Sequence, residues 1–420
     1  MTPPHHPAHP LPAAGPLSAA DLLTNRIRPY PWGSTTAIAR LTGRRPTGEP
    51  EAELWMGAHP DSPSTLDRGN GPEPLDQVIA RDPHHELGRR VAQRYGARLP
   101  FLVKLLAAEH ALSVQVHPSA DQAEAGYAAE EAAGVPRDAA HRIYRDRHHK
   151  PELLCALDDF DALCGFRDPA ATAALMASLD APALAPWIAT LRSADPATAL
   201  RTVLTEALDA DRAGGEEAVA ELAPALERAA GTPGPHSATF AAYAAAGRDY
   251  PGDPGLVAAL LLNHVRLRPG QALFLDARVP HAYLHGTGVE IMANSDNVLR
   301  CGLTPKHVDV QALATVVDFR PGPPTLVPPT GGVDGELHYR TPAAEFALSR
   351  LDLLGRATLA ADGPQILLCT EGSAELHRSP GRSLTLRRGD SAFLSATGAQ
   401  AELRGTATLY RARVPEHPAV

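Results

Sequence analysis

Three short stretches of the chain carry side chains that could together hold a divalent cation. Gln115 and His117 are two positions apart, Lys150 and Glu152 have the same spacing, and His281 follows a proline in a third stretch. Successive side chains of a β-strand alternate between its two faces, so each pair shares one face if these stretches are extended. Imidazoles and carboxylates are ordinary zinc ligands, and three of them with an open position form the usual catalytic arrangement.

Spacing alone is a weak indication of a metal site, because these positions lie far apart and match no short metal-binding motif. In the alternative interpretation the side chains are structural. The amide of Gln115 is then hydrogen-bonded, the first histidine lies in a turn, and the carboxylate pairs with Lys150. The face argument also leaves the third ligand open, because His281 and His285 would lie on the same face of one strand.

A second dense group of polar residues, from Glu290 to His307, follows another predicted strand and includes Asp296, Arg300 and Lys306. Such density is typical of the rim of a binding pocket. The structural alternative is a capped turn, in which Asn and Asp are common, with the arginine paired to a carboxylate.

The elements that must position these residues have the composition of short buried strands. Phe101–Leu106, Leu112–His117 and Leu153–Leu157 are apolar or β-branched runs of strand length. From about residue 168 the chain becomes rich in Ala, Leu and Glu, with apolar residues at helical spacing, which predicts an all-helical segment. One of its helices is expected to begin at Pro196, because the preceding Asp is a good cap.

Strands are predicted again in the last third of the chain. Beyond a Pro/Gly-rich linker at 321–332, short apolar runs recur at regular spacing, as in a β-sandwich or barrel. The turn and strand at Arg268–Leu275 resemble those at Arg388–Leu394, which indicates two distantly similar β units.

Composition excludes several classes of protein. Of 420 residues 44% are hydrophobic, enough for a sizeable core. Lys plus Arg number 39 against 48 Asp plus Glu, a net charge of -9, whereas a nucleic-acid binder usually has a basic excess. No apolar run is long enough to cross a bilayer, and the N-terminus does not resemble a secretory signal. The four cysteines form no CxxC pair, so we expect reduced thiols in a cytoplasmic protein.

Six motifs, in family order, strongly resemble class I mannose-6-phosphate isomerases of the cupin superfamily. They are YPWG at Tyr30–Gly33, ELWMG at Glu53–Gly57, QVHP at Gln115–Pro118, HKPE at His149–Glu152, PHAY at Pro280–Tyr283 and the long block Asn294–Lys306. The resemblance runs from about residue 26 to 320, and the last block alone is highly specific. The C-terminal strands also resemble the last domain of that family.

The resemblance implies a mainly β fold with an α-helical insert, built from cupin-type jelly-roll sandwiches. The expected divisions are a disordered tail (1–20), a catalytic cupin domain in two parts (21–167 and 251–325), a helical insert domain (168–250) and a C-terminal jelly-roll domain (326–420).

The resemblance also implies one Zn²⁺ per chain, and it selects His281 over His285 as a ligand. The implied ligands are Gln115, His117, Glu152 and His281. Arg300 would be the active-site arginine, and the other expected pocket residues are catalytic Lys150, Glu290 and Asp296 and substrate-binding Ser113, Lys104, Tyr283 and Lys306.

The expected activity is the interconversion of D-mannose 6-phosphate and D-fructose 6-phosphate through a cis-enediol, in mannose metabolism and GDP-mannose biosynthesis, by a cytoplasmic monomer that binds neither nucleic acid nor membrane. Two alternatives are a metal-dependent cupin oxygenase and a non-catalytic phosphosugar-binding cupin. An oxygenase would prefer iron and an open oxygen site, which fits poorly with Gln115 as ligand and a cationic pocket. A binding protein would leave the polar cluster around Arg300 without a role.

Overall fold

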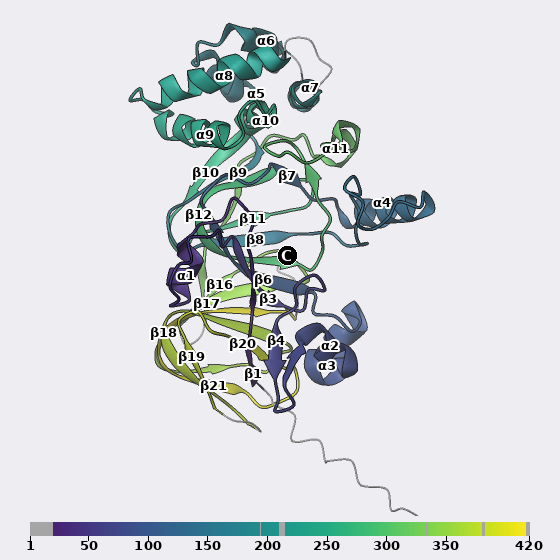
Figure 1. The fold of residues 1–420 in the computed structure, drawn as a ribbon, viewed down its shortest axis with the longest axis vertical. Coiled ribbons are helices and arrows are strands. Elements are labelled where there is room, and N and C mark those ends of the chain that lie inside the picture. Colours follow the sequence, from purple (N-terminus) through teal and green to yellow (C-terminus); the bar gives the residue numbers. More distant parts are fainter. Residues whose placement is uncertain (1–19, 194, 210–214, 333–334, 380–382, 417–420) are drawn as a thin grey trace, which may run out of the picture.

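The computed structural model describes residues 20–193, 195–209, 215–332, 335–379 and 383–416. The tail expected at residues 1–20 therefore lies outside the described part except for Ala20. Figure 1 shows three layers along the longest axis of the molecule: a group of helices at one end, a β-sheet in the middle and a second β-sheet at the other end. Among the described residues, none of the helices has the length and hydropathy needed to cross a membrane.

The middle layer is an antiparallel sheet that curls around the long strand β12. Its main path runs β14-β11-β8-β12-β6-β3-β2, and β7, β9, β10 and β13 join it through the first half of β12. The strands are β2 (Arg26–Arg28), β3 (Glu53–Gly57), β6 (Phe101–Ala108), β7 (Gln115–Val116), β8 (Glu152–Ala156), β9 (Phe160–Phe166), β10 (Leu262–Leu267), β11 (Ala272–Leu275), β12 (His281–Ala293), β13 (Leu299–Arg300) and β14 (Thr325–Val327).

The predicted strand Leu112–His117 is shorter in the structure, because only β7 belongs to a ladder. Before β7, the backbone N–H groups of Leu112 and Val114 donate to the carbonyls of Tyr283 and Gly302, at 2.8 and 3.0 Å, in hydrogen bonds that belong to no ladder. After it, Pro118 leads directly into helix α4, whose N-terminus is capped by Ser119. The chain here is a short crossing between two irregular segments, which a composition-based prediction does not separate from a strand.

The helical layer shares its hydrophobic core with the middle sheet. Its helices are α5 (Pro169–Ala177), η1 (Pro182–Leu184), α6 (Ala185–Ser193), α7 (Pro196–Leu208), α8 (Gly215–Ala230), α9 (Ser237–Asp249) and α10 (Gly255–Leu261). Asp195 caps α7 as expected, accepting from Thr198 N at 3.2 Å. The layer continues past the expected boundary at residue 250, because the apolar α10 is entirely buried between the helices and the sheet.

The third layer is a second antiparallel sheet, ordered β1-β20-β18-β21-β17-β16-β15, with β19 paired to β18. Its strands are β1 (Ala20–Leu23), β15 (Thr330–Gly331), β16 (Glu336–Tyr339), β17 (Ala347–Leu359), β18 (Gln365–Arg378), β19 (Leu384–Arg387), β20 (Ser391–Leu394) and β21 (Ala401–Arg413). The N-terminal strand β1 thus pairs with the C-terminal sheet, although we expected residues 21–167 to begin the central domain. Unpaired sheet edges are a liability, and β1 covers the edge of β20.

The predicted linker at 321–332 is also partly regular, because β14 pairs with β11 of the middle sheet and β15 pairs with β16 of the C-terminal sheet. The remaining elements are β4 (Thr65–Asp67) and β5 (Pro72–Pro74), which form a small hairpin, and the helices α1 (Ala37–Leu41), α2 (Leu75–Arg81), α3 (Pro83–Tyr95), α4 (Ala120–Ala132) and α11 (Val310–Val316).

The side chain of Arg68, which follows β4, joins strand β1 to helix α3 through two ion pairs. Arg68 Nη2 lies 2.7 Å from Asp21 Oδ2 on β1, and its Nη1 lies 2.6 Å from Glu86 Oε1 on α3. Both carboxylates are buried. Burial alone would lower the pKa of the guanidinium, but its two acidic partners raise that pKa above its ordinary value.

We expect Arg68→Met to lower the free energy of unfolding by about 3–5 kcal/mol, because it leaves two buried carboxylates without their cation. Urea denaturation measures the change. Arg89→Met, at an exposed position of α3, the helix that carries Glu86, is the control and should stay within about 0.5 kcal/mol of the parent. Equal stability of the two variants would contradict the role assigned to Arg68.

Candidate metal centre and substrate pocket

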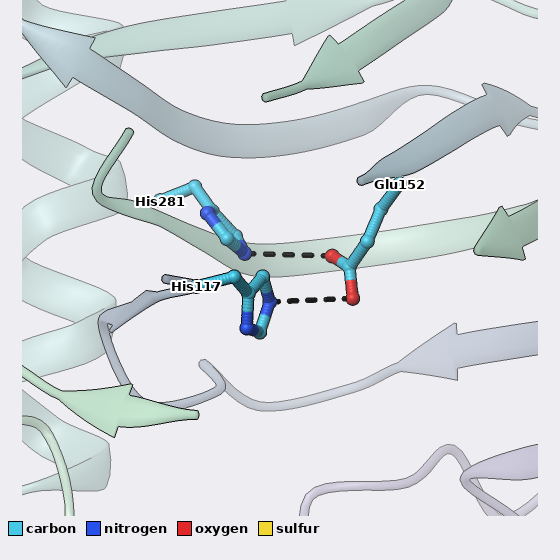
Figure 2. Close-up of side chains that lie close together, drawn as sticks. All are labelled: His117, Glu152 and His281. Atoms are coloured by element: carbon cyan, nitrogen blue, oxygen red, sulfur yellow. Dashed lines mark ion pairs between the residues drawn. The ribbon is translucent and has the colours of Figure 1, made fainter. Parts of the chain in front are cut away.

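The middle sheet brings three ligand-type side chains from separate elements together. His117 directly follows β7, Glu152 is the first residue of β8, and His281 is the first residue of β12. Because β12 pairs with β7 at one end and with β8 at the other, it connects all three positions. Figure 2 shows the two imidazole rings pointing toward the same carboxylate.

These three side chains form a compact, buried cluster. His117 Nε2 lies 3.3 Å from Glu152 Oε1, and His281 Nε2 lies 3.5 Å from Glu152 Oε2. The centroids of the two rings are 5.1 Å apart. The three residues are only 1–4% exposed, so their polar atoms have little contact with solvent.

Hydrogen bonds at the far side of each ring fix which nitrogen carries the proton. His117 Nδ1 is 2.8 Å from the carbonyl of Asn297, and His281 Nδ1 is 2.9 Å from the carbonyl of Val279. A carbonyl only accepts, so each Nδ1 donates and each Nε2 of a neutral ring carries a lone pair. Such outer hydrogen bonds are typical of metal-binding histidines.

The charges of the cluster favour the binding of a cation. Burial lowers the pKa of His117 to about 4, so its ring is neutral. Burial would raise the pKa of Glu152, but Lys150, 3.1 Å away, and the imidazoles lower it well below the usual range. The lone pair on His117 Nε2 therefore faces an ionised carboxylate, and this buried nitrogen has no hydrogen-bond partner. Two nitrogens and one carboxylate oxygen are donors that fit zinc.

A second group with suitable side chains, His59, Asp61 and Asp296, differs in its hydrogen bonds. His59 Nδ1 accepts from the backbone N–H of Asp61 at 3.2 Å, so the proton resides on Nε2, which lies 3.3 Å from Asp296 Oδ1. Burial would raise the pKa of Asp296, but His59 lowers it to about 2. The pair satisfies itself and needs no cation.

Two further ligand candidates, Gln115 and His285, differ in where their side chains lie. Gln115 lies opposite His281 in the β7–β12 ladder, and its Nε2 donates to Ser113 Oγ at 3.3 Å, which turns its amide nitrogen away from a ligand role. His285 is exposed, because the pairing of β12 with β9 shifts register between Tyr283 and His285. The side chain beside the carboxylate is therefore that of His281.

A buried ionic network extends from the metal cluster along β12. Lys104 Nζ lies 3.0 Å from Glu290 Oε2 and 3.4 Å from Glu53 Oε1, and Tyr283 donates to Glu290 Oε1 at 2.8 Å. Burial raises the pKa of Glu290, and Lys104 opposes this shift. Glu53, which also accepts from Trp55 Nε1 at 2.7 Å, was not predicted as a site residue, although it lies in the ELWMG motif.

Three cationic side chains, those of Arg145, Arg300 and Lys306, lie close enough to repel one another. Arg300 lies opposite Gln115 in the short β13–β7 ladder. Burial and the charge of Arg145 lower the pKa of Arg300, and burial, Arg300 and Arg145 together lower the pKa of Lys306. Among the described residues, no ion pair joins any of these three cations to a carboxylate. Sequence reasoning missed Arg145, because an arginine in an irregular segment carries no pattern.

Asn297 connects the metal cluster to the segment that precedes Lys150. Its carbonyl holds His117 Nδ1, and its side-chain oxygen accepts from the backbone N–H of Arg145 at 2.7 Å. Its Nδ2 donates to the carbonyls of Asp146 and His148 at 2.7 and 2.9 Å. The residue is fully buried. It was part of the predicted polar block but was not singled out.

We expect Asn297→Asp to lower turnover roughly 10–100-fold, as is typical for partners of metal ligands, because a carboxylate would face two carbonyls that now accept hydrogen bonds. The measurement is kcat together with metal content. Gln365→Glu is the matched control, since the buried Gln365 Nε2 also donates to a backbone carbonyl, that of Ala360, but in the C-terminal sheet. Equal kcat values in the two variants would show that Asn297 does not position the metal ligands.

Comparisons with known proteins agree on one family. One family model, phosphomannose isomerase type I, catalytic domain, matches residues 22–169, and another, mannose-6-phosphate isomerase, cupin domain, matches residues 336–414. The chain is 40% identical to mannose-6-phosphate isomerase of Salmonella typhimurium, covering 93% of this chain and 98% of that relative. It is 32% identical to mannose-6-phosphate isomerase 2 of Arabidopsis thaliana, covering 88% and 87%.

The fold agrees as well. A solved structure of mannose 6-phosphate isomerase from Salmonella typhimurium, bound to its substrate and to zinc, has a TM-score of 0.87 at 39% identity and covers 94% of this chain and 100% of its own. The similarity spans all three layers and confirms the expected mainly β, cupin-type fold with a helical insert.

Proposed function

This chain belongs to the type I mannose-6-phosphate isomerases, and we propose that it interconverts D-mannose 6-phosphate and D-fructose 6-phosphate through a cis-enediol beside a single zinc ion. The observation that carries the proposal is the pair of buried imidazole Nε2 atoms that face the carboxylate of Glu152, with both Nδ1 atoms hydrogen-bonded to backbone carbonyls. The proposed ligands are Gln115, His117, Glu152 and His281.

The donor set of the cluster supports zinc, and the neutral amide oxygen of Gln115 would complete it without adding negative charge. Bound zinc supplies Lewis-acid polarisation of a substrate oxygen. The carboxylate of Glu152 is kept ionised by Lys150, so it is ready to act as a ligand.

The cationic cluster supports binding of the phosphate group. Lys306, Arg145 and Arg300 repel one another and have no described carboxylate partner, so a phosphate dianion would relieve this repulsion. In the proposed arrangement, Lys306 and Arg145 hold the phosphate, and Arg300 stabilises negative charge that develops on the enediolate oxygens. Ser113, beside Gln115, offers a hydroxyl to the same end of the substrate.

Proton transfer between C2 and C1 requires a base whose pKa lies close to the working pH. Glu290 fits this requirement better than Asp296, because burial raises the pKa of Glu290, whereas His59 holds the pKa of Asp296 at about 2. Tyr283 and Lys104 donate to Glu290 and would position it and exchange protons with it. Lys150 would assist at the ring-opening step as a proton donor.

A coupled assay for fructose 6-phosphate formation tests the proposed function. We expect turnover to disappear on chelation and to return with added Zn²⁺, because the carboxylate and the two imidazoles alone provide no electrophile. Undiminished turnover by protein shown to be metal-free would refute the zinc dependence. Absence of turnover in protein that contains one zinc per chain would refute the activity itself.

A further inference from the structure

A cavity of about 470 Å³ lies between the middle sheet and the C-terminal sheet, away from the metal centre. Ala156, at its wall, is the last residue of β8, whereas Glu152 is the first residue of that strand. The two sites are thus separated by about 13 Å, the length of a strand of this size. Cavities of about 300–1,000 Å³ are typical of small-molecule sites, and they occur preferentially between domains.

Three arginines from different elements line this interdomain cavity. Arg40 comes from α1, Arg350 from β17, and Arg388 from the turn between β19 and β20. Arg350 is held by Asp352 at 3.0 Å. Arg40 and Arg388 form no ion pair with any residue that the structure describes, so two guanidinium groups remain available to an anion.

The backbone positions these arginines closely. Gly270 has a positive φ of 82°, and a Cβ built on it would lie 3.1 Å from Arg350 Nη1. Gly389, with φ of 92°, approaches so closely that its Cβ would lie 2.5 Å from the Cα of Thr42, just after α1. The turn that carries Arg388 is thereby fixed against the helix that carries Arg40.

These glycines belong to the two similar turn-and-strand units of the sequence, Arg268–Leu275 and Arg388–Leu394. The turn of each unit lines the same cavity, one from each β-sheet layer. The two similar units of the sequence therefore each contribute one turn to the lining of the same cavity.

The remaining lining residues suit a polyhydroxylated ligand. Asp158 and Glu371 offer carboxylates that accept hydrogen bonds from sugar hydroxyls, and Thr287, Thr370 and Tyr410 add hydroxyl groups. Guanidinium groups bind phosphate in a bidentate manner. We propose that the interdomain cavity is a second binding site, separate from the metal centre, for a phosphorylated carbohydrate.

Calorimetric titration with D-glucitol 6-phosphate tests this site, because that ligand has no carbonyl and cannot be isomerised. We expect two sites per chain in the parent protein, one in the Arg40→Ser/Arg388→Ser variant, and two in the Arg387→Ser control, whose exposed arginine does not line the cavity. Thermal melting followed by circular dichroism should be the same for all three, because the replaced side chains are exposed.

A single site in the parent protein, or two sites that persist in the double variant, would overturn the proposal. The Arg300→Ala/Lys306→Ala variant removes cations that are proposed to bind substrate at the metal centre, so a site that it retains is the cavity. A failure of the cavity proposal can therefore be distinguished from a failure of the proposed function. Titration with inorganic phosphate should give an affinity at least about tenfold weaker at the cavity, a difference of 1.4 kcal/mol. Equal affinities of inorganic phosphate and D-glucitol 6-phosphate for the cavity would show that the site recognises only an anion, which would contradict a carbohydrate ligand.

Discussion

His281→Ala should remove zinc from the protein and abolish isomerisation. The variant would leave Glu152 facing one imidazole instead of two, within a cluster that excludes water. We expect zinc affinity to fall by more than the roughly 10–100-fold that is typical when only an outer partner of a ligand is lost. Metal analysis after dialysis and the coupled assay measure the two effects.

His285→Ala is the control for this prediction, because His285 lies four residues along the same strand and is exposed. It should retain one zinc per chain and parent-like turnover. If His285→Ala lost the metal while His281→Ala kept it, the proposed ligand set would be wrong.

Arg300→Ala should keep zinc but lower kcat by about 10²–10³-fold, the usual effect of removing one group that stabilises a developing oxyanion. In the β13–β7 ladder Arg300 pairs with Gln115, and among the described residues no hydrogen bond or ion pair joins its guanidinium to His117, Glu152 or His281. Zinc content should therefore stay at one per chain, while kcat falls. Arg300→Lys keeps the charge and should recover part of the lost turnover, whereas the exposed Arg320→Ala should behave as the parent.

The kinetic constants separate two roles for this arginine. If Arg300 only held the phosphate, KM would rise and kcat would be unchanged, because that contact is present equally in the ground state and the transition state. Parent-like turnover at saturating substrate would exclude Arg300 from the stabilisation of the enediolate.

Local patterns predicted the parts of the site that depend on strand geometry. The two-residue spacing of Lys150 and Glu152 corresponds to side chains that lie together, 3.1 Å apart, as the alternation of an extended chain requires. The same alternation brings Gln115 and Ser113 together, with 3.3 Å between Nε2 and Oγ. The resemblance then selected His281. Strand alternation alone could not, because it assumes a regular ladder, and a register shift after Tyr283 turns His285 toward solvent.

The parts that could not be predicted depend on contacts between distant segments. Arg145 and Asn297 lie in irregular chain, where no periodicity indicates orientation, and they meet because the side-chain oxygen of Asn297 accepts from the backbone N–H of Arg145, far away in the sequence. The helical layer extends beyond the expected boundary because α10 is apolar on all sides, which is equally compatible with a buried strand. The place of β1 depends on a partner at the opposite end of the sequence.

The pairing of Ala20–Leu23 with Ser391–Leu394 sets an order on biosynthesis. Translation proceeds from the N-terminus, so the first strand leaves the ribosome long before its partner exists. Until then, its backbone N–H and C=O groups have no partners on β20. Asp21, which pairs with Arg68, therefore stays outside its final sheet until the C-terminal strands form. The C-terminal sheet is therefore complete only after residue 394 has been made, and contacts of this sequence separation are slow to close. A ribosome-stalled chain that ends before residue 391 should expose this N-terminal strand to protease, whereas the released protein should protect it.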